Sequence, residues 1–175
     1  MPWKGAQIVI KRKHCHTFVR QFLRLLAMQM SQAGDTITMI TGLGAAVSPA
    51  ATTPRINGAV GSISTGTVVG TGSNPVLISD YSLQTIINNG VGAGQLQYAI
   101  QTFLAQYEIG ASRYFPTERV FTNASGASIT VNEIGLYSTP AGAAPTFMLS
   151  RDLLSFAIPN GQTRTVRYVI YTTTA

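Results

Sequence analysis

Charged side chains are scarce in this chain. Asp, Glu, Lys and Arg make up 10% of its 175 residues, against about 25% in an average soluble domain. Hydrophobic residues account for 45%, so the composition is not that of a disordered chain. The length fits one domain with a proper core. A surface with so little charge is easiest to explain if partners cover much of it.

Cysteine and histidine are almost absent. Cys15 is the single cysteine, which excludes an intrachain disulfide. Only His14 and His16 accompany it, and three consecutive residues cannot complete a four-ligand zinc site. A Ser-His-Asp triad would have to draw its histidine from this same stretch. We therefore expect no metal, no cofactor, no small-molecule substrate and no enzymatic activity, and a hydrolase is disfavoured.

Long apolar runs are also missing. The longest, residues 18–30, is interrupted by Arg20 and Arg24 and falls short of the roughly 20 apolar residues that a membrane span needs. The same two arginines argue against a secretory signal. We expect no membrane association. The acid-free, Arg-rich amphipathic segment leaves a mitochondrial transit peptide open as an alternative.

Positive charge is concentrated at the N-terminus. The net charge of +6 equals the contribution of six residues that precede the first acid, Asp35: Lys4, Lys11, Arg12, Lys13, Arg20 and Arg24. From Asp35 onward, six basic residues balance six acidic ones. The sequence therefore predicts a basic N-terminal arm, residues 1–34, followed by a neutral body, residues 35–175.

The arm has apolar spacing typical of a helix over 17–30. Because its apolar side chains are too numerous for a solvated tail, we expect the arm to dock on a neighbouring protein. Nucleic-acid contact through counterion release stays open as the less favoured alternative. The residues expected to make the contact are Lys11, Arg12, Lys13, Phe18, Arg20, Phe22, Arg24, Leu25 and Leu26.

The body has the pattern of short strands separated by Gly, Pro and Asn turns. Strands are expected over 36–41, 65–70, 95–102, 118–122, 128–137 and 163–171, with an irregular loop around 42–54. No second strong helix is expected. The prediction is a mainly β protein, an antiparallel β-sandwich or barrel-like body with one helix in its N-terminal arm.

Two parts of the body resemble a known family. The stretches are ITVNEIGLY at 129–137, LSRDL at 149–153 and IPNGQTRTVRYVI at 158–170, with VVGTG at 68–72 and ISDYSL at 78–83 upstream. They are similar to bacteriophage virion structural proteins, whose pattern reads EIGLY, then RD, then PxGxT. The resemblance covers roughly residues 65–171. It implies a virion location after assembly in the host cytoplasm, with other virion proteins and copies of the chain as partners.

Five residues of this pattern have a physical interpretation. Glu133 and Arg151 are expected to pair across neighbouring strands and hold their register, and Asp152 to join an ion pair. Gly135 permits a bulge or a close backbone approach, and Gly161 suits a tight turn before the last strand. These are scaffold roles.

The expected function is therefore that of a non-enzymatic virion structural subunit. Its body would assemble with copies of itself, and its arm would dock on a capsid, neck or tail protein. The resemblance does not choose among these positions. The alternative is a receptor- or glycan-binding tail module, which would carry aromatic side chains clustered on surface loops; the single Trp3 lies in the arm instead.

Overall fold

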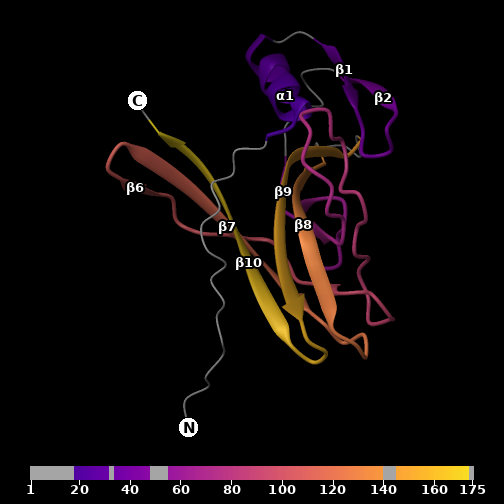
Figure 1. Ribbon diagram of the computed structural model, residues 1–175. Coiled ribbons are helices and arrows are strands. Elements are labelled where there is room, and N and C mark those ends of the chain that lie inside the picture. The colour runs from indigo at the N-terminus through magenta and orange to yellow at the C-terminus, as the bar shows by residue number, and fades with distance from the viewer. Residues whose placement is uncertain (1–17, 32–33, 48–54, 140–144, 174–175) are drawn as a thin grey trace.

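The computed structural model describes residues 18–31, 34–47, 55–139 and 145–173 (Figure 1). These residues form one helix and ten strands. The elements are α1 (Arg20–Ser31), β1 (Asp35–Thr38), β2 (Gly44–Val47), β3 (Gly66–Gly70), β4 (Gln97–Tyr98), β5 (Thr102–Phe103), β6 (Tyr107–Ile109), β7 (Ser112–Thr122), β8 (Ile129–Ser138), β9 (Phe147–Ile158) and β10 (Thr163–Thr173).

Two antiparallel sheets make up the body. Sheet I has the order β3-β8-β9. Sheet II is built on β7, which pairs with β10 along one edge and with β4, β5 and β6 in turn along the other. β1 and β2 form a separate hairpin beside α1 (Figure 1). The predicted mainly β, antiparallel, sandwich-like body with one helix near the N-terminus is confirmed.

The core lies between the two sheets, as alternation along their strands dictates. In β10, Val166 and Tyr168 are buried while Arg167 between them is exposed. Phe121 of β7 and Val131 of β8 are fully buried as well. The sheets are also joined by polar contacts, because the Tyr98 hydroxyl donates to the carbonyl oxygens of Val69 and Ile87, at 3.3 and 2.6 Å.

The sequence analysis did not predict the long strand β9. The first six residues of β9, 147–152, are all buried, so the strand shows no alternation that a period of two would reveal. β7 begins six residues before the expected 118, and the expected strand 95–102 pairs only as β4 and β5. β2 lies inside the loop expected around 42–54, of which residues 48–54 are outside the described part of the chain.

The helix belongs to the body. The Val19 amide donates to the Leu149 carbonyl oxygen at 2.9 Å, and Phe18 forms an antiparallel bridge with Ser150 of β9. Leu25 and Met28 are buried in the common core. The residues from Phe18 onward thus do not form part of a projecting arm, and only residues 1–17, outside the described ranges, are left for one.

Replacing Leu25 by Ala tests this packing. Leu25 is 2% exposed, whereas its neighbour Leu26 is 44% exposed. We expect Leu25→Ala to lower the free energy of unfolding by about 2–5 kcal/mol, and the matched Leu26→Ala to change it by less than about 0.5 kcal/mol. Urea titration measures both. Equal, small effects would mean that the helix is not part of the folded core.

Candidate functional site

An irregular segment covers the outer face of sheet I. Residues 71–87 leave β3 and fold back on themselves, with the Thr71 amide donating to the Thr85 carbonyl and the Ile87 amide to the Val69 carbonyl, at 2.9 and 3.0 Å. Such a segment lacks a full strand or helix ladder, so its remaining backbone groups need partners from elsewhere. We call it the covering segment.

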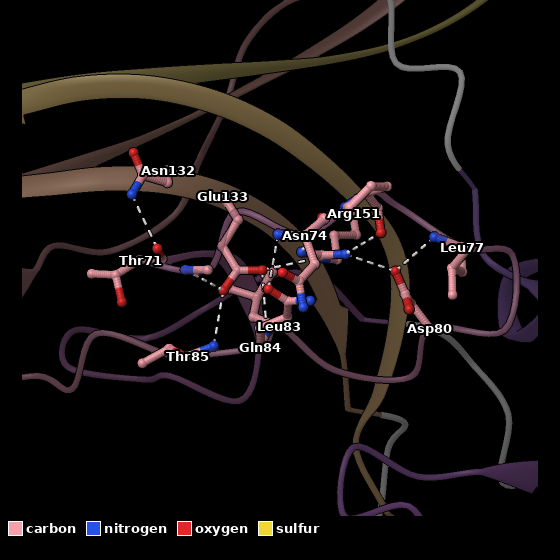
Figure 2. A network of polar contacts seen from close by, with 12 residues as sticks. Thr71, Asn74, Leu77, Asp80, Leu83, Gln84, Thr85, Asn132, Glu133 and Arg151 are labelled. Carbon is pink, nitrogen blue, oxygen red and sulfur yellow. Dashed lines mark hydrogen bonds and ion pairs between the residues drawn. The ribbon is translucent and has the colours of Figure 1, made fainter.

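Glu133 of β8 serves three of these backbone groups (Figure 2). Its carboxylate accepts the backbone N–H groups of Gly72, Gln84 and Thr85 at 3.0, 3.1 and 2.9 Å. The side chain itself is completely buried. A buried carboxylate that accepts three N–H bonds brings both ends of the covering segment to one point.

Arg151 of β9 balances that charge. Its Nε lies 2.8 Å from Glu133 Oε2 and its Nη1 2.8 Å from Asp80 Oδ2. Its guanidinium also donates to the carbonyl oxygens of Asn74 and Pro75, at 3.1 and 3.4 Å. Burial alone would lower the pKa of Arg151, but the bonds to Glu133 and Asp80 outweigh it and raise that pKa. We call Glu133, Arg151 and Asp80 the Glu133 clamp.

Small residues allow the backbone to approach the clamp. A Cβ added at Gly70 or Gly72 would lie 2.6 or 2.5 Å from Glu133 Oε1. One added at Gly135 would lie 3.0 Å from a methyl carbon of Leu83. Gly135 thus serves a close approach, as expected, while the register shifts of β8 flank it, between Val131 and Glu133 and between Leu136 and Tyr137.

Four of the five stretches named in the sequence analysis therefore meet in one place. EIGLY supplies Glu133 and Gly135, RD supplies Arg151, VVGTG supplies the two glycines and ISDYSL supplies Asp80. The last residue of EIGLY, Tyr137, accepts the Leu83 amide on its hydroxyl at 2.7 Å. The expected Glu133–Arg151 pair is confirmed, and it does more than hold two strands in register.

The chemistry of the clamp is structural. Every polar contact of Glu133 goes to a protein donor, and the Arg151 side chain is 1% exposed. No substrate can reach either group without displacing the covering segment. Within the ranges that the structure describes, no group of three His, Cys, Asp or Glu side chains is arranged to hold a metal ion.

A second buried arginine, Arg119 of β7, was not predicted. Its guanidinium lies 5.0 Å from the centre of the Tyr98 ring, and burial lowers its pKa to about 10. It donates, at 2.7–3.1 Å, to the carbonyl oxygens of Ala59, Thr65, Thr67 and Ala99. The sequence did carry a signal for its burial, because Arg119 lies two residues from Thr117 and from Phe121 and therefore faces inward with them.

Asp152 and Gly161 have local roles. The Tyr168 hydroxyl donates to Asp152 Oδ2 at 2.8 Å and also bonds to the Ser150 hydroxyl, which ties β10 to β9. Arg167 of β10 forms an ion pair with Glu118 of β7. Gly161 has a φ of +75° in a turn closed by the Gln162 amide and the Pro159 carbonyl, which confirms the expected tight turn.

The expected docking residues are dispersed. Lys11, Arg12 and Lys13 lie outside the described residues. Leu25 is buried in the core, whereas Arg20 and Leu26 are exposed. The Arg24 guanidinium donates to the Thr36 carbonyl oxygen at 2.7 Å. These side chains do not form one continuous contact surface.

Phe18 and Phe22 line an apolar groove where α1 meets the open end of the sandwich. Their rings stack at 4.0 Å. Phe103, Phe115 and Ile170 of sheet II form the facing wall, and the groove holds about 510 Å³. The groove brings two of the predicted docking residues together at the surface.

Aromatic side chains also gather on the outer face of sheet II. The Tyr107 and Tyr114 rings stack at 4.9 Å, and the Tyr114 and Tyr171 rings at 5.7 Å. This row lies on strands, and its rings face one another. It is therefore not the loop cluster that a glycan-binding module was expected to carry.

Two further findings bear on the class of protein. α1, the single helix among the described residues, is not long and apolar enough to cross a membrane. A comparison of the chain with known protein families, with curated proteins and with solved structures found no match.

Removing Arg151 tests the Glu133 clamp. Arg151→Met leaves the Glu133 charge buried without its partner, so we expect the free energy of unfolding to fall by about 3–5 kcal/mol. The matched control, Arg113→Met, breaks an exposed pair with Glu108 and should cost at most about 1 kcal/mol. Denaturant titration measures both.

A second variant covers the case in which Arg151→Met does not fold. The double variant Glu133→Met, Arg151→Met removes both buried charges and should recover part of the loss. Amide hydrogen exchange should then be fast at Gly72, Gln84 and Thr85, whose acceptor is gone. Protection of these amides equal to that in the wild type would contradict the clamp.

Proposed function

We propose that this chain is a non-enzymatic structural subunit of a bacteriophage particle. The observation that carries the proposal is the convergence of four of the five phage-like stretches on the Glu133 clamp. Residues that resemble a family pattern there hold a covering segment on a sheet, which is a scaffold role. A catalytic pattern would instead bring reactive groups to an accessible cavity.

The surface of the body supports a place inside an assembly. The apolar groove at Phe18 and Phe22 is open to solvent. Exposed large apolar side chains lie elsewhere on the described surface: Leu23, Met30, Leu43, Val60, Leu77, Ile78, Val91, Ile100 and Ile109. With charged residues at 10% of the chain, this surface is better suited to contact with partners than to a free monomer.

The segment before α1 is proposed as the attachment element. Residues 1–17 carry four of the basic side chains, Lys4, Lys11, Arg12 and Lys13, and no acid. They also include the apolar stretch 8–10. The apolar content favours docking on a neighbouring capsid, neck or tail protein. Contact with nucleic acid is the alternative that the charge favours.

Deleting residues 1–16 tests the attachment. The described body begins at Phe18, so we expect the shortened chain to fold and unfold like the full one. We expect it to lose incorporation into particles assembled without the native subunit, measured as copies per particle by quantitative mass spectrometry. Normal incorporation of the shortened chain would show that the arm is not the anchor.

A charge variant separates the two kinds of partner. Replacing Lys4, Lys11, Arg12 and Lys13 by Gln keeps the apolar residues of the segment. If the arm docks on protein, this variant should still join the particle, with little dependence on salt. If the arm grips nucleic acid, attachment of the full chain should weaken steeply with salt, and that slope should collapse in the variant.

A further inference from the structure

β10 forms a long, regular edge of sheet II. All eleven of its residues, Thr163 to Thr173, pair with β7 without a register shift. Among the described residues, no strand pairs with its other edge. In Figure 1 the ends of β6, β7 and β10 extend away from sheet I, so this part of sheet II stands clear of the rest of the body.

Ladder geometry tells which backbone groups point outward. The Pro116 and Val120 carbonyls of β7 accept the Leu104 and Ala99 amides, so these β7 residues direct their backbone away from β10. Their partners on β10, Val169 and Thr165, must direct their own N–H and C=O groups to the opposite edge. Arg167, between them and opposite Glu118, does the same.

The outward edge lacks the usual protection. Proteins block exposed edges with Pro, Lys, inward charges, bulges or short strands. β10 contains no Pro, Lys, Asp or Glu and has no bulge. The Arg167 charge is bound to Glu118 on the neighbouring strand, with Nε at 2.6 Å from Oε1. β-branched and aromatic residues fill most of the strand, which favours pairing with a further strand.

We propose that this edge pairs with β10 of a second copy, antiparallel, about a two-fold axis at Tyr168. Tyr168 is the midpoint of Thr163–Thr173, so this register overlaps the two strands over their full length. It places outward-facing residues opposite outward-facing ones, as the ladder requires. If the two-fold axis passed through any other residue of β10, outward-facing residues would still meet, but the ends of both strands would be left without a partner.

Charge selects the same register. A centre at Tyr168 places Arg167 opposite Val169 of the other copy, and Arg164 opposite Thr172. A centre one residue earlier, at Arg167, would set two arginines directly opposite each other, which is unfavourable. The edge is thus self-complementary, as an isologous interface must be. This inference rests on the proposed function, which already calls for contacts between copies, and names the strand that makes one.

The first experiment blocks the edge without touching the fold. In Val169→Pro the lost N–H is one that points away from β7, and Pro is tolerated at such positions of edge strands. We expect the full-length wild type to be a dimer by sedimentation and Val169→Pro a monomer with an unchanged circular dichroism spectrum. Val169→Ala is the matched control and should remain a dimer.

Thr165→Pro provides a second block should Val169→Pro fail to fold, since its N–H also points outward. A wild type that stays monomeric at the highest attainable concentration would overturn the proposal, and so would a folded Pro variant that still dimerises. A monomer that nevertheless enters particles would leave the proposed function standing. A dimer that never enters particles would leave the β10 pairing standing instead.

A charge pair tests the register. Val169→Glu would place two carboxylates opposite the Arg167 side chains across the axis, whereas Val169→Arg would place two more positive charges there. Both introduce one charge at the same half-buried position. We expect dimerisation of the Glu variant to be about tenfold tighter than that of the Arg variant at low salt. Equal affinities of the two variants would exclude the Tyr168-centred register.

Discussion

The outer layer of this body depends on one carboxylate. Glu133 accepts N–H groups from Gly72, Gln84 and Thr85, residues that no regular ladder could serve together. A charged acceptor in a buried position forms stronger hydrogen bonds than a neutral one. It also needs a counter-charge, which Arg151 supplies while it binds Asp80 at the far side of the same segment. Glu133, Arg151 and Asp80 therefore fix the path of the covering segment and also balance the buried charges.

Inside the sandwich, Arg119 binds irregular backbone in a similar way, as a donor instead of an acceptor. Arg119 carries a buried charge that donates hydrogen bonds to four carbonyl oxygens, and the Tyr98 ring lies against its guanidinium. Burial disfavours the charged form, which is why its pKa falls. The planar guanidinium offers several donors in fixed directions, so a single side chain of β7 can bind the loop before β3, β3 itself and the residues between β4 and β5.

The body is held firmly at its centre and is open at its margins. The core, the Glu133 clamp and the Arg119 contacts fix sheet I, the covering segment and most of sheet II. Three features of the margin stay uncovered by other described residues. They are the apolar groove beside Phe18, the exposed apolar side chains, and the outer edge of β10, with which no described strand pairs. In an assembly of repeated copies, each subunit needs a stable body and free surfaces for contact with its neighbours. The fixed centre and the uncovered margin of this body agree with the proposed function in that respect.

The sequence by itself determined the class of fold and the local devices. Alternation predicted β8 and β10, periodicity predicted the helix, and Asn160-Gly161 predicted the turn. The Glu133–Arg151 pair was also predicted, because the two opposite charges flank apolar positions, although β9, which carries Arg151, was not. These features depend on neighbours within a few residues, or on one pair of strands.

Only the tertiary structure decided the remainder. β9 was missed because burial on both faces erases the alternation by which a strand is recognised. The sequence predicts the helix as part of a projecting arm, because an apolar stripe can pack equally well on the chain's own body or on another protein. The contact with β9 shows that it packs on the body. Gly72 meets Glu133 across 61 positions of the chain, and Asp80 meets Arg151 across 71. No periodicity reports such a contact, because it exists only when the sheet has formed and the segment has folded over it.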